Sequence, residues 1–120
     1  MEIIEVPIKL LRVTHEVEGY WMMNWIKENG DSVKDSPQYL YLMGDFEPLW
    51  DWCRFRHLPS MYMSKKLMEV LYSIVYEGQK EPIKIYKDMR INTGHKRAAC
   101  LLFLGAKNIK AEIVSDDTKL

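Results

Sequence analysis

The sequence has no excess of charge of either sign. Its 17 Lys and Arg residues balance 17 Asp and Glu residues in a chain of 120. Proteins that hold phosphate backbones regardless of sequence need an overall positive field, so the charge balance excludes that class. Contact with nucleic acid or another polyanion therefore requires a local basic patch.

Cysteine and long apolar runs are also scarce. The two cysteines, Cys53 and Cys100, show no repeated spacing, and together with His15 and His57 they match no zinc signature. No apolar run approaches the length of about 20 residues that a membrane-spanning helix needs. The first residues also lack the charged and apolar regions of a signal peptide. We therefore expect a reduced, cytoplasmic protein with no metal site and no membrane contact.

Aromatic residues, by contrast, are frequent. The chain holds 4 Trp, 7 Tyr and 3 Phe residues, most of them between Tyr20 and Tyr62. A hydrophobic content of 48% in a chain of this length suits one cooperative core. We therefore predict a single domain over residues 1–120.

The spacing of apolar residues predicts helices that alternate with short strands. Helices are expected at residues 18–29, 37–43, about 64–77 and 95–104. Strands are expected at residues 3–8, 83–86, 89–92 and 109–114, the middle two forming a hairpin. Residues 45–59 show no sustained period and are expected to be irregular or briefly helical. The predicted fold class is α/β (α+β), a small mixed sheet with packed helices.

The segment Thr93-Gly94-His95-Lys96-Arg97 joins a predicted strand to a predicted helix and has the parts of an anion site. The first N–H groups of a helix lack partners within it, the helix dipole is positive there, and glycine allows close approach to the backbone. Lys96 and Arg97 add full charges that suit a di- or triphosphate. In the alternative interpretation Thr93 caps an ordinary helix, Gly94 eases a turn, and Lys96 and Arg97 are solvated.

Residues 67–114 resemble the ParB N-terminal/sulfiredoxin superfamily. The residues that carry the resemblance are Gly78-Gln79-Lys80-Glu81-Pro82-Ile83, Gly94-His95-Lys96-Arg97-Ala98-Ala99, Leu104-Gly105-Ala106 and Ile109-Lys110-Ala111-Glu112-Ile113-Val114. The resemblance extends to the first strand and leaves an aromatic-rich insertion at about residues 14–60. It implies that Gly94, His95, Lys96 and Arg97 contact nucleotide phosphates with Thr93 flanking them, and that the ligand is a nucleoside triphosphate with Mg²⁺.

The sequence departs from this superfamily at two positions of the motif. Sulfiredoxins carry their reactive cysteine where His95 stands, so we do not expect their chemistry. ParB proteins usually have Glu and Arg where His95 and Lys96 stand, which puts ParB-type metal coordination in doubt. The chain shows no helix-turn-helix domain, so we expect a stand-alone domain and not a complete partition protein.

The aromatic-rich insertion has three interpretations. Its Trp50, Trp52, Phe55 and Tyr62 could stack on bases with the help of neighbouring arginines, form a local core over the sheet, or make a protein-interaction surface. The residue pattern favours the local core, because Trp21 and Trp25 fit one buried stripe.

The function predicted from these observations is binding of a nucleotide or other phosphate ligand. Phosphohydrolase or phosphotransferase activity is a further step that rests on the resemblance alone. Its catalytic residues are unknown: His95 is a candidate general base, and no motif selects among Glu5, Glu16, Glu18 and Glu28. The alternative is a non-enzymatic ParB-like accessory module of a plasmid or phage, which binds DNA or a protein partner.

Overall fold

The computed structural model describes residues 2–14 and 20–115. Of the residues considered above, His15, Glu16 and Glu18 lie outside this part of the chain, as does the predicted start of the first helix at residue 18.

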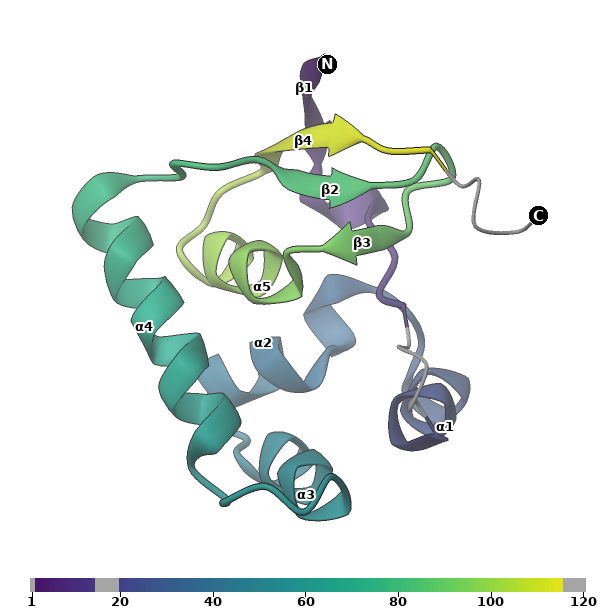
Figure 1. Cartoon of the computed structure of the whole chain (residues 1–120), viewed down its shortest axis with the longest axis vertical. Helices are drawn as coiled ribbons and strands as arrows, with labels where there is room; N and C mark the ends of the chain where they lie inside the picture. The colour runs from purple at the N-terminus through teal and green to yellow at the C-terminus, as the bar shows by residue number, and fades with distance from the viewer. Residues whose placement is uncertain (1, 15–19, 116–120) are drawn as a thin grey trace.

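A four-stranded mixed sheet forms one side of the molecule (Figure 1). Its strands are β1 (Ile3–Pro7), β2 (Ile83–Ile85), β3 (Ile91–Thr93) and β4 (Asn108–Ile113), in the spatial order β1-β4-β2-β3. Strand β4 pairs antiparallel with β1 and parallel with β2, while β2 and β3 form the predicted antiparallel hairpin. Ile109 and Ala111 of β4 are buried and Lys110 between them is exposed, so one face of the sheet packs on the interior.

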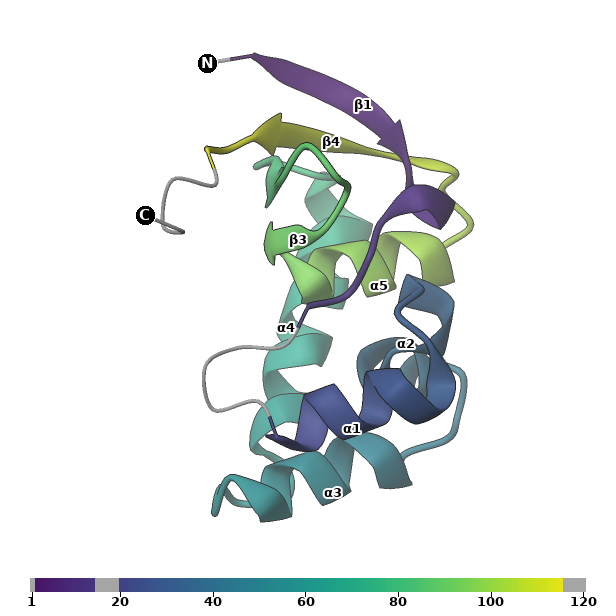
Figure 2. The same ribbon diagram turned by 90° about the vertical axis from the view of Figure 1, so that its right-hand side faces the viewer.

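Within the described residues, five α-helices lie on the buried side of the sheet (Figure 2). They are α1 (Tyr20–Asn29), α2 (Pro37–Leu42), α3 (Glu47–Phe55), α4 (Tyr62–Glu77) and α5 (His95–Phe103), with short 3-10 turns at Ile8–Leu10 and Val33–Asp35. Helix α5 lies directly against the sheet, α2 packs against α5, and α3 lies farthest from the sheet. The long helix α4 packs along α5 and reaches α3. The predicted fold class, a small mixed sheet with packed helices, is confirmed.

The insertion at residues 14–60 shares the core of the sheet. Met22 and Val33 belong to the same buried cluster as Ile83, Ile85 and the other inward-facing strand residues. A second cluster joins Leu49 of α3 to the inner side of α4 and to Cys100 of α5. The insertion therefore packs as part of the body that holds the start of α5.

Most predicted helix ends are confirmed. Ser36 caps α2 through its hydroxyl, which accepts a hydrogen bond from the N–H of Tyr39 at 3.2 Å. Gly30 follows α1 with φ of 97°, and its N–H donates to the carbonyl of Ile26 at 2.7 Å. Gly78 ends α4 in the same way, since its N–H donates to the carbonyl of Ile74 at 2.8 Å.

The structure refines two expectations about helices, one within the insertion and one at the start of α4. Residues 45–59 contain the regular nine-residue helix α3, whose buried Leu49 and Cys53 are four residues apart. The apolar residues Phe55, which is exposed, and Trp50, which is half-buried, do not follow this spacing and made the helical pattern hard to recognise in the sequence. Helix α4 begins at Tyr62 and not at Ser64. Ser64 lies inside its first turn, where its hydroxyl donates to the carbonyl of Met61.

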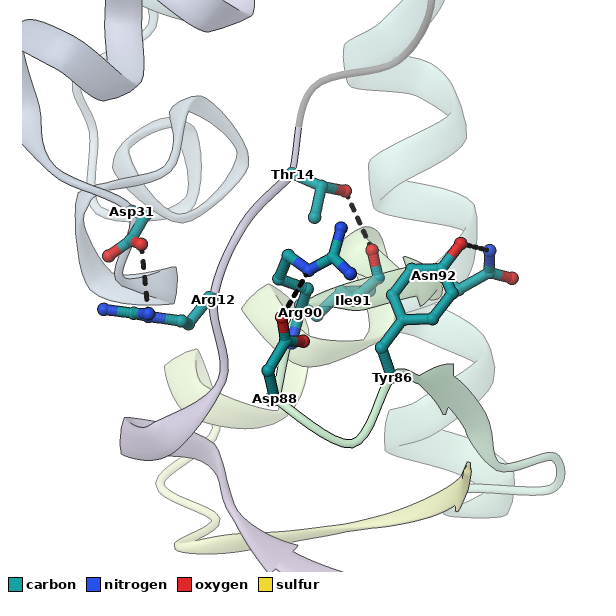
Figure 3. A network of polar contacts seen from close by, with 8 residues as sticks. All are labelled: Arg12, Thr14, Asp31, Tyr86, Asp88, Arg90, Ile91 and Asn92. Carbon is teal, nitrogen blue, oxygen red and sulfur yellow. Dashed lines mark hydrogen bonds and ion pairs between the residues drawn. The ribbon is translucent and has the colours of Figure 1, made fainter. Parts of the chain in front are cut away.

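The chain that follows the first 3-10 turn runs beside the hairpin and fixes its position (Figure 3). The N–H of Arg12 donates to the carbonyl of Met89, and the N–H of Ile91 donates to the carbonyl of Arg12, both at 2.9 Å. The Thr14 hydroxyl donates to the carbonyl of Ile91 at 2.8 Å. Thr14 is thereby held next to the point where β3 turns into α5. No helix in the described part of the chain is long and apolar enough to cross a membrane.

Candidate functional site

The five predicted site residues lie together in the lining of a cavity of about 570 Å³. Thr93, Gly94, His95, Lys96 and Arg97 line one side of it, where β3 turns into α5. The other polar lining residues are Thr14, Gln38, Arg56, Tyr62 and Lys66. The apolar lining residues are Met22, Leu49, Trp52, Met63 and Val70. The cavity thus joins the predicted phosphate loop to the insertion and to α4.

The start of α5 has unpaired backbone donors. Gly94 is its N-cap, with φ of 111°, and no side chain accepts a hydrogen bond there. Among the described residues no acceptor meets the N–H groups of His95, Lys96 and Arg97, and the first backbone bond of the helix runs from Ala98 to the carbonyl of Gly94. Thr93, which the alternative interpretation took as the cap of the helix, is the last residue of β3, and the N-cap position is held by Gly94. Three donors and the positive end of the helix dipole are therefore free to meet an anion.

Gly94 is required by packing against the sheet. A Cβ atom at this position would lie 2.3 Å from Cγ2 and 2.6 Å from Cβ of Ile83. Ile83 is a fully buried residue of β2. The glycine therefore lets α5 begin tight against β2.

The cavity is strongly basic in a protein with no net charge. Arg56, Lys66, Lys96 and Arg97 line it, and none of its described lining residues is acidic. The Arg97 guanidinium lies 3.6 Å from the carboxylate of Glu81, an exposed residue outside this cavity. This is the local basic patch that the balanced composition requires for binding a polyanion.

The Nε2 nitrogen of His95 accepts a hydrogen bond from Thr14. A general base would need this nitrogen to be free. Nε2 lies 3.3 Å from the N–H of Thr14 and 3.4 Å from the Thr14 hydroxyl, which donates elsewhere. Burial, and to a smaller extent the positive charge of Lys96, lower the pKa of His95 to about 4. The imidazole is thus neutral at pH 7, with Nε2 as the acceptor and the proton on Nδ1. In this geometry His95 holds Thr14 against the start of α5.

Gln38 is a polar residue of the cavity that sequence reasoning missed. Its side chain is only 5% exposed, and its Oε1 is buried without a hydrogen-bond partner among the described residues. An unsatisfied buried group of this kind costs about 1–3 kcal/mol. No sequence signal marks Gln38, because it stands in α2 between Pro37 and Tyr39 with no motif around it.

The aromatic residues of the insertion mainly stack on one another. The rings of Trp21 and Trp25 lie 5.3 Å apart and those of Trp21 and Trp52 lie 5.7 Å apart, both pairs nearly parallel. Phe46 packs against both Tyr41 and Trp50. Trp50 and Trp52 are half-buried and not exposed, and Trp52 also forms part of the cavity wall. This arrangement supports the interpretation of the insertion as a local core.

Neither cysteine is placed for chemistry at the cavity. Cys100 is fully buried on α5, and its thiol donates to the carbonyl of Leu67 at 3.8 Å. Burial raises the pKa of Cys100 to about 12, although Lys96 acts in the opposite direction. The thiol therefore stays protonated at neutral pH. In the described part of the chain no three His, Cys, Asp or Glu residues gather in a way that could hold a metal ion.

Comparisons of this chain with protein-family models, with curated proteins and with solved structures give no match.

Proposed function

We propose that this protein binds a nucleotide, or another ligand with a phosphate chain, with the phosphates at the start of α5. The observation that carries the proposal is the combination at one cavity of three unpaired N–H groups with four cationic side chains. Among the lining residues that the structure describes, no carboxylate opposes them.

The basic lining residues of the cavity suit the phosphates of a nucleotide, and its apolar lining residues suit the base. Phosphate oxygens are strong acceptors that bind well to free N–H groups at a helix start. Lys96 and Arg97 follow directly on α5, and Lys66 faces the same space from α4. The apolar wall that includes Leu49 and Trp52 suits a base, and the cavity volume of about 570 Å³ lies in the range of small-molecule sites.

The proposal also draws on the resemblance of residues 67–114 to the ParB N-terminal/sulfiredoxin superfamily. In that superfamily nucleotide phosphates bind at the Gly-x-x-Arg loop, which corresponds here to Gly94-His95-Lys96-Arg97. A Mg²⁺ ion would be carried in by the phosphates and by water, since this ion is often held with few protein ligands. Phosphohydrolase and phosphotransferase activity stay predictions of the resemblance, because His95 does not offer a free basic nitrogen at neutral pH.

The test is thermal unfolding with and without Mg²⁺ in the presence of ATP, ADP, CTP, GTP or inorganic tripolyphosphate. A ligand at about 100 times its dissociation constant stabilises the folded state by about 2.7 kcal/mol, which is several degrees for a domain of this size. We expect a shift with at least one of these ligands and its loss in Arg97→Ala.

The matched control is Lys84→Ala. Lys84 is an exposed cation between the inward-facing Ile83 and Ile85 of β2, and it lines no part of the cavity. It should keep the full ligand-induced shift. If none of these ligands shifts the unfolding temperature, the proposal is overturned, and the alternative of a module that binds DNA or a protein partner is favoured. If Lys84→Ala loses the shift as fully as Arg97→Ala, the ligand is attracted only by unspecific charge.

A further inference from the structure

We propose that Gln38 recognises the base of the bound nucleotide, reading one edge of the base with its side-chain amide. This inference rests on the proposed function and adds to it the part of the site that selects among nucleotides. It also assigns a binding role to the insertion, which lies outside the phosphate loop.

The amide of Gln38 is buried in the wall of the cavity and is not satisfied by the protein. The side chain is 5% exposed, it lines the same cavity as the start of α5, and its Oε1 has no partner in the described part of the chain. Buried polar side chains in folded proteins are almost always hydrogen-bonded. We infer that the partner of this buried amide oxygen, on a residue that lines the cavity, is supplied by a ligand toward which the side chain turns.

The backbone of Gln38 is held in place before any ligand arrives. Ser36 caps α2, its hydroxyl donates to the carbonyl of Val33 at 2.7 Å, and Pro37 is buried at the first position of the helix. Gln38 follows on the first turn of α2, which packs against α5. Because the backbone is already fixed, little backbone entropy is lost when a ligand binds to this residue.

The wall beside Gln38 has the character that a flat base requires. Trp52 lines the cavity, and its ring continues the stack formed by Trp25 and Trp21. Met22 and Leu49 complete an apolar surface around the amide. Stacking on an aromatic ring favours every base, so this wall supplies affinity without selectivity.

The selectivity would come from the amide. A glutamine side chain presents one acceptor and one paired donor group, and it can form two hydrogen bonds with a base edge that offers a donor next to an acceptor, as with N6 and N7 of adenine. A phosphate chain or a sugar offers no such flat edge. The inferred ligand is therefore a nucleoside phosphate rather than a polyphosphate or a sugar phosphate.

The experiment compares dissociation constants, measured by calorimetry, for ATP, CTP, GTP, UTP and inorganic tripolyphosphate in the full chain and in Gln38→Met. Methionine keeps the length of the side chain and removes the amide. In the unmodified protein at least one nucleotide should bind about tenfold or more tightly than tripolyphosphate, since one two-bond contact with a base discriminates by about this factor. In Gln38→Met this preference should disappear while tripolyphosphate binds within about twofold of the original.

Each other outcome has a definite meaning. If Gln38→Met keeps the full preference for one nucleotide, or if no nucleotide binds better than tripolyphosphate, the role of Gln38 is overturned while phosphate binding at α5 stands. If no ligand binds to the unmodified protein, both proposals fail together. An unchanged shift of the unfolding temperature on addition of tripolyphosphate shows that the variant is folded and that its phosphate site is intact.

Discussion

His95 and Gln38 are two polar side chains in one cavity with opposite surroundings. His95 is half-buried and accepts a hydrogen bond from Thr14, whereas the Oε1 of the fully buried Gln38 has no partner among the described residues. Satisfied polar groups hold a fold together, and unsatisfied ones cost stability unless a ligand completes them. We therefore assign His95 to the architecture of the site and Gln38 to its ligand.

The assignment of His95 predicts how stability depends on pH. Its pKa in the folded state is about 4, below the value of about 6.5 expected in the unfolded chain. Between these values the unfolded state binds more protons, so the free energy of unfolding falls as the pH is lowered from about 6.5 to about 4, by about 1–3 kcal/mol. Above about pH 6.5 this contribution is present in full.

Urea unfolding of the unmodified protein and of His95→Gln at several pH values tests this. Glutamine offers Thr14 an oxygen acceptor that does not titrate in this range. The variant should be less sensitive to pH in that window, and equal slopes for the two proteins would show that His95 titrates normally.

The assignment of Gln38 predicts that Gln38→Met makes the ligand-free protein more stable. Replacing an unpartnered buried amide with an apolar side chain of similar size removes its desolvation cost, which is worth about 1 kcal/mol or more. The urea midpoint should rise without a change in the slope of the transition.

The matched control is Gln79→Met. The amide of Gln79 donates to the carbonyls of Glu81 and Lys110 and accepts from the N–H of Lys110, at 2.9 to 3.0 Å. Its removal should lower stability by about 0.5–1.5 kcal/mol or more. A loss of stability in both variants would mean that the amide of Gln38 has a partner in the ligand-free protein.

At the scale of elements, the contact between α5 and β2 positions the phosphate loop. Gly94 meets Ile83 at a distance that leaves no room for a Cβ atom, and its φ of 111° is one that other residues rarely adopt. Gly105, at the other end of α5, also has a positive φ of 90°, but a Cβ atom there would meet nothing within 4 Å. Substitutions at the two glycines therefore distinguish the free-energy cost of backbone strain, which both share, from the cost of a steric clash, which arises only at Gly94.

Gly94→Ala should therefore destabilise the protein far more than Gly105→Ala. The strain of a positive φ costs about 1–2 kcal/mol in either variant. Only in Gly94→Ala must α5 also move away from β2, and this overpacking lowers the free energy of unfolding by a further amount of about 1–3 kcal/mol. Chemical denaturation gives both values, and equal costs would show that α5 can shift away from the sheet without penalty.

The same elements show what could be predicted from the sequence. The strands and the helices α2, α4 and α5 were predictable because their signals are local: period-two strands, Ser36 before Pro37, and glycines at helix ends. Helix α3 was obscured, since aromatic residues that pack on α1 and α2 interrupt its apolar spacing. The phosphate loop was recognisable as a motif, but the meeting of Arg56, Lys66 and Gln38 with it depends on tertiary packing and leaves no local pattern.

At the scale of the whole molecule, charge separation gives a neutral protein a basic cavity. The 17 cationic and 17 anionic residues cancel in total, yet four cations line the cavity without a carboxylate among its described lining residues. Acidic residues lie elsewhere, for example Glu112 of β4 beside Lys84 of β2 in the register of the sheet. Among the described residues, Glu81 forms an ion pair with Arg97 of the cavity.

Glu81 should therefore weaken anion binding by competing for Arg97. The pair is separated by 3.6 Å and Glu81 is 75% exposed, so its strength is at most about 1 kcal/mol. Glu81→Gln should tighten tripolyphosphate binding by up to about fivefold at low salt, measured as a dissociation constant by calorimetry. The gain should fade at about 0.5 M salt, where charges at exposed positions are screened within a few ångströms.

Glu112→Gln is the control, because it removes the same charge from the sheet and away from the cavity. Its affinity for tripolyphosphate should stay within about twofold of the original at both salt concentrations. An equal gain in the two variants would mean that net charge alone attracts the ligand. A gain confined to Glu81→Gln locates the phosphates at Arg97, because only this change frees the guanidinium without altering any residue that lines the cavity.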